Sequence, residues 1–507
     1  MTNNKEDKSL FWGCFIALIA TAFGFIVRAF IIGDWAKEFN LDATQQGELF
    51  GAGLWPFAIS IILFSLIMDK IGYKTAMVFG FACHVTSVIL TVTATGYNSL
   101  YLAMFVCALG NGTVEAYINP VVATLFSKEK ARYLNYLHGG WSGGFVVGGI
   151  ILIAMGTIGW RTKVLILLIP IIIYFIMLIA KKFPVGESAA AGVPLKETLG
   201  EVGGLGFFLI SWMALSEALR STHLVVATDA DPLAPLKIGG YISAVIGLGL
   251  GFYLKSFFGR PMFILLLLLM IPLATTELGV DSWITDLMTP VMGKWAPWLL
   301  VYTAAIMTAL RFCAGPILRA FSPLGLLAVC AVLAGLGLVA LANAETAGMI
   351  FLAGTLYGIG KTFFWPTTLG IVSEQFPRGG AMTLNGISGT GMLGVGVLGA
   401  MFLGSIQDGT IDKNIMAENP ALHAKVVTAE KVSLFGKYMA VDPGAVGKQT
   451  PADQAVVKRV QDGSKKSALS TVAWFPAIMF ATYVALLLYF KSRGGYKPVD
   501  VNAPTAH

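Results

Sequence analysis

Charged residues are scarce in this chain. Asp, Glu, Lys and Arg together make up 12% of its 507 residues, whereas a soluble domain carries about 25%. Residues with hydrophobic side chains make up 56%, and the mean hydropathy is +0.75. A soluble globular domain and a disordered chain are therefore both excluded. The composition predicts an all-α polytopic membrane protein, because helices satisfy their own backbone hydrogen bonds in lipid.

Motifs of catalysis and of metal binding are also missing. The five cysteines lie in apolar segments without paired spacing, which is typical of packed free thiols. The sequence has neither a Gly-x-x-x-x-Gly-Lys-Ser/Thr loop nor a His-Glu-x-x-His motif. We therefore expect no enzymatic activity, no cofactor and no bound metal. The net charge of +7 does not indicate nucleic acid, because many basic residues occupy short loops, as they do on the cytoplasmic side of membrane proteins.

Apolar runs long enough to cross a bilayer recur along the chain. Two of them, at about 204–227 and 238–257, lie between two sets of six. The first of these two contains Glu217, Arg220 and His223, so an interfacial position is the alternative. We predict fourteen spans, with twelve spans plus interfacial segments as the alternative. The two sets lie at about 10–32, 46–68, 74–95, 98–126, 133–158 and 161–180, and at 262–288, 297–318, 322–342, 347–373, 381–404 and 467–490.

The loops differ in charge. Lys and Arg concentrate in alternate loops, with Arg161 and Lys163 as mild exceptions. By the positive-inside rule we expect a multi-pass protein of the cell inner membrane with both termini cytoplasmic, surrounded by the lipid bilayer as a monomer. The predicted regions are an N-terminal six-helix bundle (1–183), an inter-bundle segment with two extra helices (184–260), a C-terminal six-helix bundle (261–495) and a tail (496–507). The second bundle includes a polar outer loop over 405–466, which we interpret as a small cap or a mobile loop.

Glu115 lies in the middle of the apolar stretch 99–126. A carboxylate at that depth costs roughly 2.5–3.5 kcal/mol on insertion scales, so it normally faces a cavity or a charged partner. Asn111, Glu115 and Asn119 are spaced four apart and share one helical face. This face is a candidate functional site.

The loop after the second span has the sequence Asp69-Lys70-Ile71-Gly72-Tyr73-Lys74. It resembles the Gly-x-x-x-Asp-Arg/Lys-x-Gly-x-Arg/Lys signature of the major facilitator superfamily, with Ser65 in place of the opening glycine. The two halves of the chain have similar sequence features, as an internal repeat would, and Lys361 lies at the position that corresponds to Glu115. The resemblance implies two six-helix bundles that rock about a central site. The candidate gating residues are Asp69, Lys70, Gly72, Lys74, Arg311 and Arg319.

The fourth span narrows this resemblance. Gly112-Thr-Val-Glu-Ala-Tyr-Ile-Asn-Pro120 is similar to the Gly-Thr-x-Glu-Thr/Ala-x-x-Asn-Pro motif of the fucose–galactose–hexose permeases, in which the acid takes part in proton-coupled sugar import. His138 stands where those permeases have a sugar-contacting glutamine. Their first helix carries a second acid, whereas this chain has Arg28 there. The two-acid proton relay is therefore not carried over.

Several other polar residues lie within the predicted spans. Glu277 and Asp281 are four apart, and with no cation between them they would repel each other. Lys361 is too deep to reach the membrane surface, so we expect it to pair with one of these acids or to meet the solute. The candidate solute-binding residues are Arg28, Asn111, Asn119, His138, Trp141, Glu277, Asp281, Trp283, Tyr357, Lys361, Trp365 and Asn385.

The leading hypothesis is a proton-coupled secondary transporter that moves a sugar or a related small polar solute by alternating access, with Glu115 as the coupling residue. A permanent Glu115–Arg28 salt bridge is the competing interpretation of that acid. The alternative function is transport of an organic anion, such as a sugar acid or an organophosphate, anchored by Arg28 and Lys361. A non-transporting membrane sensor is the third hypothesis. No signalling or catalytic domain supports it.

Overall fold

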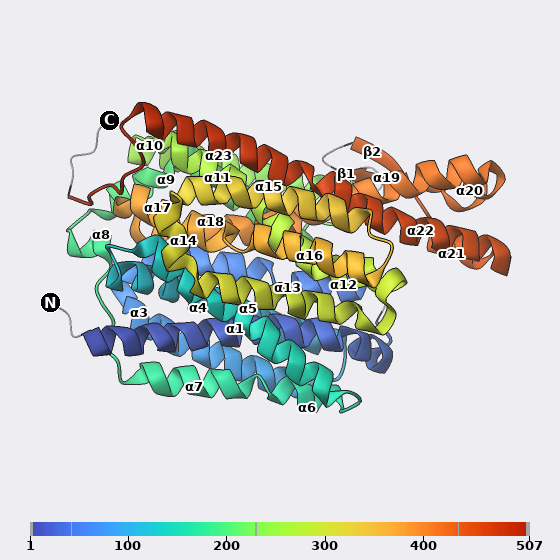
Figure 1. Ribbon diagram of the computed structural model, residues 1–507, viewed down its shortest axis with the longest axis horizontal. Coiled ribbons are helices and arrows are strands. Elements are labelled where there is room, and N and C mark those ends of the chain that lie inside the picture. The colour runs from blue at the N-terminus through green and yellow to red at the C-terminus, as the bar shows by residue number, and fades with distance from the viewer. Residues whose placement is uncertain (1–3, 42, 229–230, 434–435, 503–507) are drawn as a thin grey trace.

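The computed structural model describes residues 4–41, 43–228, 231–433 and 436–502. Long helices run side by side, and both chain ends lie on one side of the bundle (Figure 1). We call that side the terminal face and the opposite side the distal face. Among the described residues, twelve helices are long and apolar enough to cross a membrane, or thirteen with one bent pair.

The first half forms a bundle of helices whose buried apolar residues belong to a core shared with the second half. Helices α2 and α3 account for two of the predicted spans, at 46–68 and 74–95, because the chain turns at Gly72 and resumes the helix. Gly72 has φ 76° and ψ 154°, a conformation that favours glycine. The helices of this bundle are α1 (Asn4–Phe39), α2 (Ala43–Gly51), α3 (Trp55–Val92), α4 (Tyr97–Leu125), α5 (Lys130–Met155), α6 (Trp160–Leu165) and α7 (Leu168–Ile179).

The inter-bundle segment consists of α8 (Glu187–Ala190), α9 (Leu195–Ser221) and α10 (Ala234–Leu254). Helices α9 and α10 pack tightly as a hairpin, because Gly204 and Gly247 face each other without side chains. Glu217 is buried and pairs with Arg220 near the end of α9, which removes the reason for placing this helix at the interface. Both added helices are among the twelve candidate spans, as the fourteen-span prediction requires.

The second half forms another bundle, in which two helices contain a π-helical stretch. These stretches, η1 (Thr275–Gly279) and η4 (Gly394–Gly399), contact each other, and π-helical turns are frequent at functional sites. The remaining elements are α11 (Pro261–Ala274), α12 (Val280–Met292), η2 (Gly293–Trp295), α13 (Ala296–Phe312), α14 (Ala314–Ala320), α15 (Pro323–Ala342), α16 (Ala347–Lys361), α17 (Phe364–Gln375), η3 (Pro377–Gly379), α18 (Gly380–Leu393), α19 (Ala400–Glu418) and α23 (Trp474–Ser492).

A small cap projects from the distal face where we expected either a cap or a mobile loop (Figure 1). It has its own apolar cluster, which includes Ile411, Ile415, Leu422 and Val457. Strands β1 and β2 pair antiparallel, with Ala429 opposite Ala440. The cap consists of the outer part of α19 with α20 (Pro420–Val426), β1 (Ala429–Ser433), β2 (Gly436–Ala440), α21 (Pro443–Gly447) and the first part of α22 (Pro451–Val472).

Close packing of α3 against α4 gives a first prediction. A Cβ atom on Gly112 would lie 3.0 Å from the Cα atom of Phe57 and closer still to its carbonyl group. We expect Gly112→Ala to destabilise the protein by about 1–3 kcal/mol, because neither backbone can move aside freely. The melting temperature of the purified protein in detergent measures this loss. Gly249→Ala is the matched control, since no atom lies within 4 Å of that position; equal melting temperatures for the two variants would contradict the prediction.

Candidate functional site

A small cavity lies between the two bundles, with room for roughly one water molecule at about 20 Å³. Glu115 of α4 and His138 and Trp141 of α5 line it from the first bundle. The second bundle contributes Glu277, Leu278, Arg311, Trp365 and Met392. We call this the central cavity. Two of the three candidate acids, Glu115 and Glu277, and two of the four candidate aromatic residues, Trp141 and Trp365, thus line one cavity.

Glu115 begins a chain of hydrogen bonds within the first bundle. The Asn119 amide donates to Glu115 Oε2 at 3.1 Å, and Asn119 Oδ1 lies 3.0 Å from His138 Nε2. Since the amide nitrogen of Asn119 faces Glu115, its oxygen accepts from His138, and Nε2 of His138 therefore carries a proton. All three side chains are buried. The four-residue spacing on α4 and the position of His138 on α5 together produce this arrangement.

Two buried ion pairs neutralise the second bundle. Arg311 Nη2 lies 3.0 Å from Glu277 Oε1, and Lys361 pairs with Asp281. The expectation that Lys361 would pair with one of these acids is confirmed. The two acids would repel each other only with no cation between them, and here each acid has its own cation. Buried ion pairs of this kind are hard to break singly, since removing one partner leaves an uncompensated charge.

Arg311 lies in the last turn of α13, just before a bend of 67° that leads into α14. Its guanidinium group also donates to the Thr362 carbonyl at 2.8 Å and to the His138 carbonyl at 2.8 Å. Arg311 therefore joins Glu277 to the first bundle, at the point where the Glu115 hydrogen-bond chain ends.

Arg28 has no acidic partner among the described residues. Its side chain is buried, and Nε and Nη2 form no hydrogen bond. The guanidinium carbon lies 5.0 Å from the ring centre of Phe25 and 4.9 Å from that of Phe50, and the group fills the space beside Gly53. The alternative of a permanent Glu115–Arg28 salt bridge is thus not formed. Arg28 and Glu115 are both left without a counter-ion.

Two polar atoms that border the central cavity also lack partners. Glu277 Oε2 and Trp365 Nε1 are buried and form no hydrogen bond within the part of the chain that the structure describes. One is an acceptor and the other is a donor. Buried polar groups are normally satisfied, so this pair indicates a place where a small polar molecule can bind.

Other candidate solute-binding residues are used elsewhere. The Asn111 side chain contacts His84 at 2.9 Å, and the Tyr357 hydroxyl donates to the Thr276 carbonyl at 2.6 Å. Neither side chain lines the central cavity in this conformation. Trp283 belongs to α12, but its side chain lies outside the described residues.

Asn385 ties the two bundles together on the terminal side of the cavity. Its amide donates to Ser65 Oγ at 2.7 Å and to the Ala116 carbonyl at 3.0 Å. Ser65 is the residue that replaces the signature glycine, so its hydroxyl supplies a contact that glycine could not. A nearby bond joins Asn135 to Thr367 at 3.1 Å. The sequence had assigned Asn385 to the solute, and the structure places it in the closed interface instead.

The candidate gating residues fall into two groups. Asp69 lines a narrow space on the terminal side together with Glu187, Ser188 and Ser373, and Gly72 supplies the turn. Lys70, Lys74 and Arg319 are exposed there. The sequence reasoning missed Lys130, which is buried at the same level, although its place in a basic loop was the available signal.

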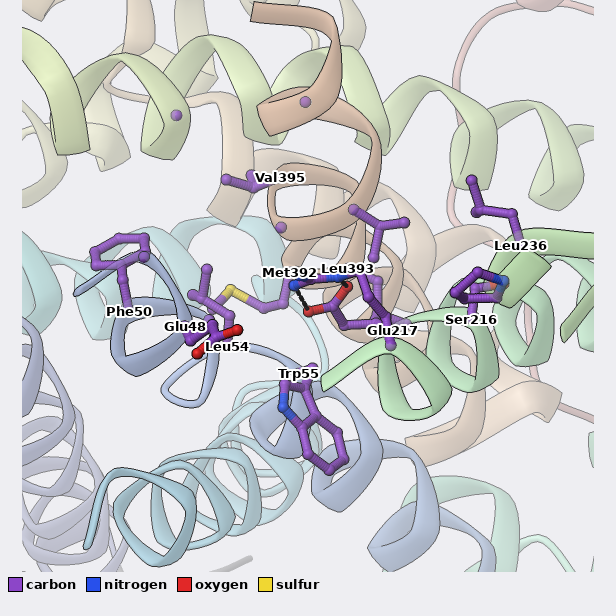
Figure 2. A pocket seen from close by; sticks show the side chains of 18 of the residues that line it. Glu48, Phe50, Leu54, Trp55, Ser216, Glu217, Leu236, Met392, Leu393 and Val395 are labelled. Carbon is purple, nitrogen blue, oxygen red and sulfur yellow. Dashed lines mark hydrogen bonds and ion pairs between the residues drawn. The ribbon is translucent and has the colours of Figure 1, made fainter. Parts of the chain in front are cut away.

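A larger cavity of about 550 Å³ opens toward the distal face. Its walls come from three parts of the chain: Phe50, Leu54 and Trp55 of the first bundle, Glu217 and Leu236 of the inserted hairpin, and Met392 and Val395 of the second bundle (Figure 2). Met392 also lines the central cavity. We call this space the distal vestibule; the molecule is hollow on the distal side and closed on the terminal side.

Two bundles of membrane-spanning helices around a shared polar cavity define the class of alternating-access membrane transporters. The family model of the Major Facilitator Superfamily matches residues 13–400, and the chain belongs to this superfamily.

Solved structures of superfamily members share the fold. The proton:xylose symporter XylE bound to 6-bromo-6-deoxy-D-glucose superimposes with a TM-score of 0.62 at 12% identity, over 96% of each chain. The transporter FucP in its outward conformation gives 0.52 at 13% identity, over 92% of this chain and 98% of FucP. At such identities the likeness concerns the fold alone.

One curated relative shows local sequence similarity. The riboflavin transporter MCH5 of Saccharomyces cerevisiae is 31% identical over 145 residues, which is 28% of this chain and 28% of that protein. The chain thus matches only about a quarter of that relative's length.

The buried pair in the second bundle gives a second prediction. We expect Lys361→Met to destabilise the protein by up to about 3 kcal/mol, because Asp281, whose side chain is only 15% exposed, is left without a cation, and Lys361→Met combined with Asp281→Asn to recover much of that loss. Thermal unfolding of the purified variants measures both changes. Arg459→Ala breaks an exposed pair with Glu418 on the cap and serves as the control, with an expected loss below about 1 kcal/mol. No recovery in the double variant would contradict the account.

Proposed function

We propose that this protein is a proton-coupled secondary transporter that moves a sugar or a related small polar solute by alternating access. The observation that carries the proposal is the isolation of Glu115. It lines the inter-bundle cavity, is buried, and accepts a hydrogen bond from the Asn119 amide, with no cation paired to it among the described residues. A charged carboxylate without a cation is costly in such a place, so protonation relieves the cost.

The contrast with the second bundle supports this role for Glu115. Glu277 and Asp281 are held by Arg311 and Lys361, and a paired carboxylate has less reason to take up a proton. Loss or gain of a proton on Glu115 alters its bond with Asn119, and Asn119 contacts His138. Since the His138 carbonyl accepts from Arg311, the change reaches the contact between the bundles.

The chemistry of the cavity wall is compatible with a hydroxylated solute, although the cavity, at about 20 Å³, has to widen before a sugar fits. Glu277 Oε2 accepts and Trp365 Nε1 donates, and Trp141 offers an aromatic face beside them. Sugars need both kinds of hydrogen-bond partner and an apolar surface against which a pyranose ring can stack. The likeness of the fold to XylE and FucP is compatible with this solute class.

The proposed orientation places the terminal face in the cytoplasm. The alternation of basic loops supports this choice. The closed terminal side and the hollow distal side then correspond to a conformation that faces outward. In this proposal the protein acts as a monomer in the cell membrane.

The third prediction concerns coupling. In proteoliposomes, we expect Glu115→Gln to abolish solute accumulation driven by an inward proton gradient while downhill flux persists. A gradient of one pH unit supports an accumulation of about tenfold in a one-to-one symporter, because about 1.4 kcal/mol corresponds to a factor of ten. Radiolabelled xylose and fucose are the first solutes to test.

Glu345→Gln is the matched control, because Glu345 is exposed in the loop after α15. It should accumulate solute like the unchanged protein. Uphill accumulation by Glu115→Gln equal to that of the control would rule out Glu115 as the coupling residue.

A second candidate function rests on Arg28. A buried guanidinium group with two unpartnered nitrogen atoms is suited to a carboxylate, and Phe50 links it to the distal vestibule. Under this hypothesis the solute is an organic anion, such as a sugar acid. Lys361 does not serve as a second free anchor in this conformation, because it is paired with Asp281.

The fourth prediction separates the two solute classes. If the solute is a sugar acid, gluconate but not glucose should raise the melting temperature of the purified protein. Arg28→Gln should then weaken gluconate binding by about 10- to 100-fold, the equivalent of about 1.5–3 kcal/mol for bonds to a charged group. Arg161→Gln is the control, since Arg161 is already paired with Glu38. Stabilisation by glucose alone would contradict the anion hypothesis.

A further inference from the structure

The inserted segment and the C-terminal tail meet on the terminal face. Both contact the short connection 374–378, which joins α17 to α18 of the second bundle. The inserted segment also contacts the first bundle. The terminal face therefore carries contacts that the twelve helices of the two bundles do not supply by themselves.

The inserted segment bridges the bundles through charged groups. Lys130, at the start of α5 in the first bundle, is 5% exposed; its ammonium group lies 2.5 Å from Glu187 Oε2 of α8 and 3.1 Å from the Ser373 carbonyl of the second bundle. Further along the insertion, Glu197 pairs with Arg378, and the Thr198 hydroxyl donates to the Arg378 carbonyl at 3.2 Å. One short stretch of chain thus holds one basic residue from each bundle.

The C-terminal tail also forms hydrogen bonds with residues 374–378. The Val499 amide donates to the Glu374 carbonyl at 2.8 Å, and the Tyr496 hydroxyl donates to the Glu374 carboxylate at 2.7 Å. Gln375 donates to the Lys497 carbonyl at 2.9 Å. A further bond, of 3.1 Å, runs from Arg378 to the Val501 carbonyl. The tail is thus bound along residues 496–501.

We propose that residues 187–198 form a latch between the two bundles, that residues 496–501 hold its anchor on the second bundle at Arg378, and that the latch must release before the terminal face can open. The proposal rests on alternating access as the proposed function. Opening on this side separates α5 from the end of α17, and that movement breaks the bonds of Lys130 to Glu187 and to Ser373. Bonds to charged groups contribute more than neutral ones, so the latch shifts the equilibrium toward the closed state.

The inserted helices connect this latch with the other side of the molecule. Helix α9 starts beside Arg378 and ends with Glu217 and Arg220 in the wall of the distal vestibule. It also contacts α18 and η4 of the second bundle. The insertion thus contacts both the closed side and the hollow side, which gives the two added helices a part in the conformational change.

The test measures distance instead of transport. Spin labels are placed at Lys128→Cys in the first bundle and Ala320→Cys in the second, both exposed on the terminal face, in a background in which the exposed Cys313 is replaced by alanine. Double electron–electron resonance then gives the distance distribution in proteoliposomes. Glu187→Gln and deletion of residues 496–507 are compared separately and together.

We expect each change to increase the long-distance population, and both together to increase it on the order of tenfold or more, the shift caused by the loss of one hydrogen bond to a charged group. Lys497→Ala is the control, because only its backbone carbonyl is used in the tail contact. A melting temperature for Glu187→Gln close to that of Lys497→Ala shows that the fold is intact.

An unchanged distance distribution in both Glu187→Gln and the tail deletion would overturn the latch. The outcome is independent of the proton role of Glu115 and of the solute. If the labels move apart as expected but no flux is found, the latch stands and the proposed transport function fails. If proton-driven flux is found but the distances do not change, the transport function stands and the latch fails.

Discussion

The energetic cost of an isolated charge inside a low-dielectric protein core is the constraint on which this structure depends. The second bundle avoids this cost by pairing Arg311 with Glu277 and Lys361 with Asp281. The first bundle leaves Glu115 and Arg28 without counter-ions among the described residues. Neutralisation must then come from a proton, from a bound solute, or from both. Under the proposed function, the paired acids of the second bundle and the acid without a cation in the first bundle are the physical basis for coupling.

The arrangement of the helices places these charged residues at the contact between the two bundles, so their charge state affects how the bundles fit together. Arg311 joins Glu277 to the His138 carbonyl, so the interface between the bundles passes through the same cavity that holds Glu115. On the terminal side Asn385 closes the interface against Ser65. On the distal side the vestibule stays hollow, and the inserted hairpin supplies one of its walls. The two faces therefore differ in this conformation, as alternating access requires.

The sequence predicted the helices well, because burial in lipid is a local property of each apolar run. It also predicted that Lys361 would pair with an acid, since a lysine at that depth has few other partners. Other features depend on helix rotation and on distant contacts. The separation of Arg28 from Glu115, the contacts of Arg311 with both bundles, and the bond from Asn385 to Ser65 are of this kind. The cap core also escaped prediction, because its apolar residues are scattered over a polar segment. The roles of the site residues stay predictions.

The most direct test of the account is the protonation state of Glu115 itself. Infrared difference spectroscopy, in water and in deuterium oxide, detects the carbonyl stretch of a protonated carboxylic acid. With the terminal face closed and the pH neutral, the account predicts that this band is present. The band should be lost in Glu115→Gln and persist in Glu345→Gln. A spectrum in which Glu115→Gln leaves the band unchanged would contradict the central claim.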